Sequence, residues 1–294
     1  GPDAPATIGT RYQIGSVSKW IASVAVLRLV DQGKLKLDTP IAAYLPELPK
    51  ATGDAVTLRH LLSNASGVPN GVSAAFKLDR TVGDLQLSPL AASVRFSGGA
   101  LEFAPGTAWN YSPTNWVLVA AIVERAGGAS FAEVIAREVL QPAGAGATGV
   151  PMGELDALPA MALAYGAAVP RVRKTTPNNP WVVAAGSIYS TAQDLMRLAD
   201  AVYEGSLLSP ASRAELSRVQ VAAEDYALGG RVRSWTVAGG AHTIAYLSGV
   251  SGGFKSLLVH VPGEAKSVVI LNNTDMQQAD VAKAAQALLE TLYR

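Results

Sequence analysis

The last third of the chain alternates short apolar runs with tight connections, and this pattern constrains the fold more than any other. Strands are predicted over 231–238, 241–247, 254–261 and 267–272. Such short connections join antiparallel neighbours, so these segments predict an antiparallel sheet. A C-terminal helix follows, with a predicted buried stripe of Val281, Ala284, Ala285, Leu288 and Leu292.

The region before the sheet is predicted to be mostly helical. Apolar periodicity and capping patterns predict helices over 18–30, 57–62 and 115–125, and from Ser130 and Thr191 onward. The segment 71–99 is weakly periodic and is expected to be an irregular cover over a cleft. The segment 141–185 is rich in Pro, Gly and Ala and is expected to be loop-like. An antiparallel sheet with helices packed on it is an α+β fold.

The composition excludes several kinds of protein and site. The 294 residues carry a net charge of +1, so no nucleic-acid partner is indicated. The absence of cysteine excludes disulfides and thiolate metal sites, and three histidines argue against a histidine-rich metal centre. No apolar run is long enough to span a bilayer. We therefore expect no metal, no organic cofactor and no membrane span.

Ser16 and Lys19 form the single Ser-x-x-Lys of the chain, at the start of the first apolar helix. Residues three apart share a helix face, so the Lys19 ammonium is expected beside the Ser16 hydroxyl. Unpaired backbone N–H groups at a helix start also favour developing negative charge. This is the layout of a serine nucleophile with an adjacent amine. The alternative is an N-cap serine followed by a surface lysine.

Two further segments carry candidate site residues. Tyr111 lies in a loop before the helix at 115–125, where its phenol can face a cleft; alternatively, its hydroxyl bonds to the backbone. The glycines of 247–254 allow a ligand to approach closely, and the alternative there is a flexible hairpin. Residues 249–253 also fit Gly-x-Ser-x-Gly. That motif precedes a helix and needs a following histidine, so a histidine-dependent triad is not predicted.

Read in order, five segments resemble the serine β-lactamase and penicillin-binding protein superfamily. They are 12–19, 27–45, 58–67, 105–116 and 185–195. The most similar branch contains the class C β-lactamases, the D-alanyl-D-alanine carboxypeptidases and related esterases. The resemblance implies an antiparallel sheet flanked by helices, with an inserted, mostly helical domain. Residues 1–36 and 186–294 would form the sheet domain and 37–185 the helical domain, with the active site between them.

The resemblance also implies roles for individual residues. Ser16 would be the acylated nucleophile, Lys19 would help to take its proton, and Tyr111 would pass a proton to the leaving group. The backbone N–H groups of Ser16 and Val250 would form the oxyanion hole. Substrate contacts are expected from Ser248, Gly249 and Asn115. His60 matches a position away from the chemistry and is expected to be structural.

Two positions depart from the family pattern. Pro113 stands where the family usually has an asparagine that binds the lysine and the substrate amide. Leu247 stands where a strand motif such as KTG or HTG begins with Lys or His. Both losses argue against a β-lactamase or carboxypeptidase and favour an uncharged acyl substrate. We therefore expect a serine hydrolase, most of all a carboxylesterase. The alternatives are a peptidase or amidase acting on D-residues or peptidoglycan fragments, an acyltransferase, and a non-catalytic binding protein.

The segment before the nucleophile is short. Family members usually place two strands of the sheet there, whereas 15 residues precede Ser16. An open sheet edge exposes unpaired backbone groups. We expect the edge near the C-terminal strand to be covered by residues 1–10, by upstream strands or by a second copy in a homo-oligomer.

The sequence shows no signal peptide, and Gly1-Pro2 resembles a protease-cleavage scar. A periplasmic or secreted location is expected.

Overall fold

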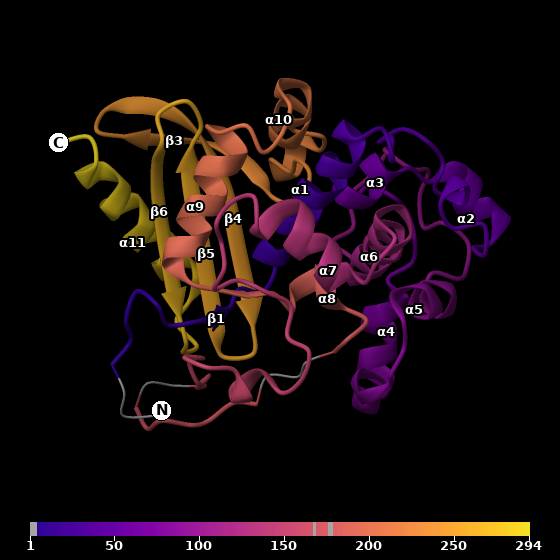
Figure 1. The fold of residues 1–294 in the computed structure, drawn as a ribbon, viewed down its shortest axis with the longest axis horizontal. Helices are drawn as coiled ribbons and strands as arrows, with labels where there is room; N and C mark the ends of the chain where they lie inside the picture. The colour runs from indigo at the N-terminus through magenta and orange to yellow at the C-terminus, as the bar shows by residue number, and fades with distance from the viewer. Residues whose placement is uncertain (1–4, 167–168, 176–178) are drawn as a thin grey trace.

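The computed structural model describes residues 5–166, 169–175 and 179–294. An antiparallel sheet forms one end of the molecule and a group of helices the other, with α1 (Val17–Asp31) between them (Figure 1). This arrangement confirms the predicted α+β fold.

Four strands form the main sheet and confirm the four predicted strands. They are β3 (Arg231–Val237), β4 (Gly240–Ser251), β5 (Phe254–Val261) and β6 (Lys266–Asn272), paired antiparallel in that order. β4 is longer than predicted, because residues 248–251 continue the strand: Ser248 pairs with Leu257 and Ser251 with Phe254. The turn is therefore reduced to Gly252 and Gly253, and the segment expected to approach a ligand is held in the sheet.

Successive side chains of each strand point to opposite faces of the sheet, and helices pack on both faces. Ala245, Leu247 and Leu258 point to one face, where they join the core that contains α1 and α9 (Ala192–Tyr203). Ile244 and Val259 point to the other face, where they pack with α11 (Gln278–Thr291). The sheet is therefore the middle layer of three.

The buried stripe of α11 differs from the prediction. Val281, Ala285 and Leu289 are buried, whereas Leu288 is 49% exposed and Leu292 46% exposed. Ala284 is exposed as well. Residues four apart lie above one another on a helix, and α11 touches the sheet along that single line, so one residue per turn is buried.

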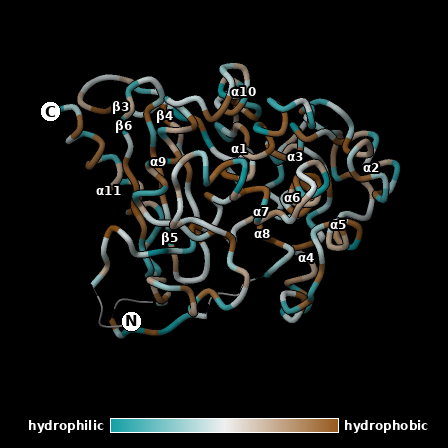
Figure 2. Tube along the Cα trace, viewed as in Figure 1, coloured by the Kyte–Doolittle hydropathy of each residue, from teal (hydrophilic) through white to brown (hydrophobic). Residues whose placement is uncertain are grey.

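Local sequence explains where the predicted helices begin and end. α6 (Pro113–Gly127) starts with Ser112 as its N-cap, whose hydroxyl accepts the Thr114 N–H, and it ends at Gly128 with φ 68°. α7 (Phe131–Ile135) starts with the predicted capping box of Ser130 and Glu133. Long hydrophobic stretches run through α1 and α6, which lie buried inside the molecule (Figure 2).

The segment 71–99 is helical, so the prediction of an irregular cover is wrong. It contains α4 (Gly71–Leu78), η2 (Arg80–Asp84) and α5 (Pro89–Phe96). The side chains of Asn70, Asp79 and Ser88 cap these three short helices. Phe96 stacks on buried Trp181 with ring centroids 4.9 Å apart. Packing on a distant tryptophan stabilises helices that are too short to show a clear period.

The remaining elements are short. They are β1 (Tyr12–Gln13), paired with β2 (Tyr189–Ser190), and the helices η1 (Ile41–Ala43), α2 (Lys50–Ala55), α3 (Leu58–Leu62), η3 (Ala136–Leu140), η4 (Leu155–Ala157), α8 (Val183–Gly186), α10 (Pro210–Ser217) and η5 (Ala222–Glu224). One core joins α1, α6 and the sheet. The division into 1–36 with 186–294 and 37–185 stays a prediction.

β6 lies at an open edge of the sheet. Within the described ranges, no strand pairs with its outer side. Thr7, Thr10 and Tyr12 line a hollow beside 269–271 without adding a strand. Residues 7–10 therefore lie beside the edge without pairing with it as a strand, and residues 1–4 lie outside the described part. No helix in the described part is long and apolar enough to cross a membrane.

Candidate active site

Ser16 and Lys19 meet at the N-terminus of α1. Ser16 is the N-cap residue, but its side chain makes no capping hydrogen bond. The Lys19 ammonium donates to Ser16 Oγ at 3.0 Å and also to the carbonyl oxygen of Ala185, and the lysine is 3% exposed. The alternative of a capping serine and a surface lysine is therefore wrong. A buried lysine nitrogen in contact with a serine hydroxyl is the arrangement in which an amine can activate that hydroxyl.

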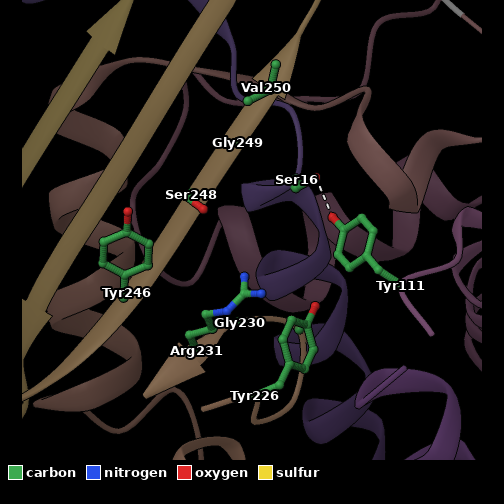
Figure 3. Close-up of a pocket in the computed structure, with 10 residues that line it drawn as sticks. Ser16, Tyr111, Tyr226, Gly230, Arg231, Tyr246, Ser248, Gly249 and Val250 are labelled. Atoms are coloured by element: carbon green, nitrogen blue, oxygen red, sulfur yellow. Dashed lines mark hydrogen bonds between the residues drawn. The ribbon is translucent and has the colours of Figure 1, made fainter. Parts of the chain in front are cut away.

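Tyr111 completes this group from the loop before α6. Its hydroxyl donates to Ser16 Oγ at 2.6 Å (Figure 3). Lys19 Nζ lies 4.9 Å from the centre of its ring. The loop is fixed by Asn64, whose carbonyl accepts the Asn110 N–H at 2.9 Å and whose side chain accepts the Trp116 indole N–H at 3.3 Å. The phenol thus faces the serine, not the backbone.

Strand β4 passes directly beside Ser16. In a two-residue hairpin Ser251 and Phe254 exchange hydrogen bonds, so the N–H and C=O of the preceding residue, Val250, point away from β5. β3 ends its pairing at Tyr246, so it does not cover that side of Val250. Within the described ranges no acceptor is found for the Ser16 N–H. The N–H groups of Ser16 and Val250 are thus candidates for the two donors that an oxyanion hole requires.

These residues open into one pocket with a volume of about 370 Å³. It is lined by Ser16, Tyr111, Tyr226, Gly229, Gly230, Arg231, Tyr246, Ser248, Gly249 and Val250 (Figure 3). Ser248, Gly249 and Val250 therefore lie where they were expected. Leu247 points to the opposite face and is buried in the core.

Arg231 was missed from the sequence, and it brings a cation to a pocket that was expected to favour an uncharged acyl substrate. It is the first residue of β3 and pairs with Tyr246, which brings its guanidinium to the pocket. Nε donates to the Glu224 carbonyl at 3.0 Å and Nη2 to the Glu224 carboxylate at 3.3 Å. The guanidinium also lies 5.4 Å from the ring centre of Tyr226. No local sequence pattern predicts that Arg231 reaches the pocket, because this depends on the register in which β3 pairs with β4.

Tyr226 and Tyr246 were also missed, because the turn after η5 places the first and the strand register places the second. Both phenols line the pocket, and burial raises the pKa of each. Tyr226 is 2% exposed, so it is a buried part of the pocket wall. The pocket therefore combines the Ser16 hydroxyl, one guanidinium and three phenols.

Asn115 is not in the pocket, which corrects the expectation of a substrate contact. It is buried in α6, where its amide donates to Asn64 at 3.2 Å and its oxygen accepts from the Ser66 hydroxyl at 2.7 Å. Pro113 is the first residue of the same helix and lines a different hollow. The amide that the family usually offers is therefore not restored by Asn115.

His60 is part of the N-terminal cap of α3, which agrees with the structural role expected for it. Its Nδ1 accepts the Thr57 N–H at 3.2 Å, and burial lowers the pKa of His60. His260 contacts Glu204 and Ser267 and does not line the pocket. Among the described residues, no group of His, Cys, Asp and Glu could hold a metal ion.

Comparison with known proteins identifies the family. Residues 1–293 match the family model "Beta-lactamase". Penicillin-binding protein 4* of Bacillus subtilis is 27% identical over 97% of this chain and 66% of its own length. Esterase EstB of Burkholderia gladioli is 38% identical over 46% of this chain and 37% of its own length. The chain thus spans from about a third to two thirds of these relatives.

The fold agrees with this match. A penicillin-binding protein of Bacillus halodurans superposes with a TM-score of 0.82 at 28% identity, over 98% of this chain and 88% of that one. The octameric penicillin-binding protein homologue of Pyrococcus abyssi superposes with a TM-score of 0.79 at 25% identity, over 98% of this chain and 68% of that one. The chain therefore belongs to the Beta-lactamase family and has the fold of its penicillin-binding-protein-like serine hydrolases.

Proposed function

We propose that the protein is a serine hydrolase that works through an acyl-enzyme on Ser16. The observation that carries this proposal is the contact of Ser16 Oγ with both Lys19 Nζ and the Tyr111 hydroxyl. A binding protein without catalysis would have no need to bury an ammonium against a serine. The same three groups that form the acyl-enzyme would release it.

The first half of the reaction forms the acyl-enzyme. Ser16 Oγ attacks the carbonyl carbon while its proton passes to the lone pair of Lys19 Nζ, which enters this step as the neutral amine. The carbonyl oxygen becomes an oxyanion between the N–H groups of Ser16 and Val250. When the intermediate collapses, the bond to the leaving group breaks and Tyr111 supplies a proton to that group. In the second half, water takes the place of the leaving group and gives up its proton to the same residues.

Carboxylic esters are the proposed substrates. An alkoxide is a better leaving group than an amine, so the hydrolysis of an ester depends less on the substrate contacts that the family makes at positions 113 and 247. Pro113 and Leu247 do not provide those contacts. The similarity to Esterase EstB supports this preference. An alcohol or amine that replaced water in the second half would give acyl transfer at the same site.

A second candidate is a peptidase or amidase that acts on D-residues with a free carboxylate. Arg231 favours it, because a guanidinium at the pocket wall can bind a carboxylate through two hydrogen bonds. The similarity to penicillin-binding proteins supports it as well.

Labelling with a fluorophosphonate tests the proposed mechanism. Mass spectrometry should locate the adduct on Ser16, and Ser16→Ala should abolish it. A fold-intact protein that forms no adduct and hydrolyses none of a panel of p-nitrophenyl esters, D-amino-acid amides and D-Ala-D-Ala peptides would contradict the proposal.

A matched pair of esters separates the two substrate classes. p-Nitrophenyl butyrate is neutral, and p-nitrophenyl hydrogen glutarate carries a carboxylate at the end of a chain of similar length. If Arg231 binds a carboxylate, Arg231→Gln should raise KM for the charged ester about tenfold or more and leave the neutral ester unchanged. An equal effect on both esters would exclude carboxylate recognition by Arg231.

Location and assembly are also proposals. We propose export to the periplasm or the medium, which fractionation of cells that express the full-length protein would test. We also propose that another strand pairs with the open edge of β6, because its outer N–H and C=O groups lack a strand partner in the described part of the chain. Light scattering of the purified chain would detect association through this edge, and a stable monomer would contradict it.

A further inference from the structure

Ser251 is the serine of the Gly-x-Ser-x-Gly segment, and it has a side-chain partner in β1. Its hydroxyl donates to Gln13 Oε1 at 2.6 Å. Gln13 is 2% exposed, and its backbone pairs with Tyr189 of β2. His260, the one histidine that follows the segment in the sequence, hydrogen-bonds to other side chains. Ser251 is therefore bound to the segment that carries Ser16 and not to a histidine.

The segment that leads to Ser16 runs along the end of β4. Next to the bond between Gln13 and Ser251, Gly15 contacts Val250. A Cβ atom at position 15 would lie 2.7 Å from the Val250 nitrogen and 2.8 Å from its carbonyl oxygen. Figure 3 shows Val250 on the strand that passes Ser16. The side-chain hydrogen bond thus lies three residues from one N–H group of the proposed oxyanion hole and one residue from the other.

The end of β4 belongs to a hairpin with β5. Among the described strands, β3 pairs with β4 only up to Tyr246, so the end of β4 pairs with β5 alone. Pairing within the hairpin does not fix its distance from α1. The Ser251 hydroxyl joins the β4 strand to Gln13. The Ser256 hydroxyl joins the β5 strand to the Ile14 carbonyl oxygen at 2.7 Å. These two hydroxyl groups hold the hairpin against the segment that leads into α1.

We propose that Ser251 and Gln13 form a positioning pair for acyl transfer: their hydrogen bond fixes the gap between the N–H groups of Ser16 and Val250. This inference rests on the proposed function, because it needs an oxyanion to form between those two groups. Neither side chain of the pair lines the pocket, so both act through the backbone. A displacement of about 1 Å at an active site can cost roughly 10²-fold in rate, so the loss of this bond should be visible in catalysis.

A pair of esters tests this role. p-Nitrophenyl butyrate forms an oxyanion, whereas its thionoester, with sulfur in place of the carbonyl oxygen, forms a thiolate-like centre that accepts hydrogen bonds poorly. Ser251→Ala should lower kcat/KM for the oxygen ester about tenfold to a hundredfold and affect the thionoester much less. The ratio of the two rates therefore reports the oxyanion hole, and a general loss of folded protein would leave that ratio unchanged.

Two further variants separate the hydrogen bond from the fold. Ser251→Thr keeps the hydroxyl and should restore most of the lost rate. Ser93→Ala is the matched control, because the Ser93 hydroxyl is also buried and donates to the Pro89 carbonyl at 2.7 Å, but it lies in α5 and does not line the pocket. It should keep the full rate and the full ratio of the two esters.

A double-mutant cycle tests whether the two side chains act as a pair. Gln13→Leu removes the acceptor. If both residues act through one shared bond, Gln13→Leu alone and Gln13→Leu combined with Ser251→Ala should lose about the same rate. Melting temperatures of the three variants would be measured beside the kinetics.

Several results would overturn the positioning role. Full activity of Ser251→Ala would show that the bond does not set the oxyanion hole. Equal losses for the ester and the thionoester, or losses that multiply in the double variant, would show that the two side chains do not act through a shared bond on the oxyanion. Failure of the unaltered protein to hydrolyse esters and to label at Ser16 would instead contradict the proposed function itself.

Discussion

Gly249 and Ser16 are in direct contact through their backbones. A Cβ atom at position 249 would lie 2.9 Å from the Ser16 nitrogen and would overlap the Ile14 carbonyl oxygen. It would also lie 2.5 Å from the hydroxyl of Ser256, which bonds to the same carbonyl. Glycine at this position lets β4 approach Ser16 closely, as the proposed oxyanion hole of Ser16 and Val250 requires.

Gly249→Ala should therefore damage the site severely. The methyl group must push β4 away from Ser16, and removal of one oxyanion donor costs roughly 10²–10³-fold in rate. Ester hydrolysis measured beside the melting temperature would separate lost activity from lost folding. Gly98→Ala is the matched control, because nothing lies within 4 Å of the added methyl group. Full activity of Gly249→Ala would refute the assigned oxyanion hole.

Ser16→Ala should abolish hydrolysis and leave the fold intact, because the side chain makes no capping bond. Lys19→Ala and Tyr111→Phe should each lower kcat/KM by several orders of magnitude. The double variant should lose less than the product of the two single losses, since the groups act as one relay. Steady-state kinetics with a p-nitrophenyl ester would measure the three losses. Independent, multiplying losses would argue against a shared relay.

Hydrolysis of β-lactams should be weak. Pro113 provides no side-chain amide at the site and Leu247 is buried in the core, so neither holds the amide of a β-lactam. Arg231 can still attract its carboxylate, so acylation of Ser16 without rapid turnover is the expected outcome. A chromogenic cephalosporin and mass spectrometry of the acyl-enzyme would measure both steps. Turnover as fast as in dedicated resistance enzymes would contradict this prediction.

Glu264 should make the stability of the protein depend on acid. Hydrogen bonds from Tyr293 at 2.7 Å and His242 at 2.8 Å lower the pKa of Glu264 from 4.5 to about 2. Because the folded state favours the ionised form, this carboxylate stabilises the protein above about pH 4.5, and the contribution is lost as the pH falls toward 2.

Melting curves between pH 6 and 2 would test the contribution of Glu264. Glu264→Gln should be less stable than the unaltered protein at pH 6, and the difference should shrink as the pH falls. Glu290→Gln removes one negative charge from α11 and controls for the change in net charge. A difference that stays constant over this range would show that Glu264 does not titrate as described.

The parts of the fold that were predicted well depend on neighbours in the chain. Ser130 and Glu133 cap a helix through contacts three residues apart, and the short connections of the sheet leave antiparallel pairing as the simplest arrangement. The helices in 71–99 escaped prediction because each is eight residues or shorter, and they depend on packing around Trp181.

The site residues that were predicted from the sequence likewise depend on near neighbours in the chain or on the family pattern, and the missed ones depend on tertiary structure. Ser16 and Lys19 lie one helical turn apart, so their contact follows from spacing alone, and the family pattern added Tyr111, Ser248, Gly249 and Val250. The charge of the pocket could not be predicted in this way. Arg231 reaches it because β3 pairs with β4 in one particular register, and Tyr226 because a distant turn places it under Trp109. Asn115 is two residues from Pro113 but faces Asn64 on another side of α6. Contacts within one turn are set by covalent geometry, whereas contacts between distant segments depend on how whole layers pack, which no local pattern records.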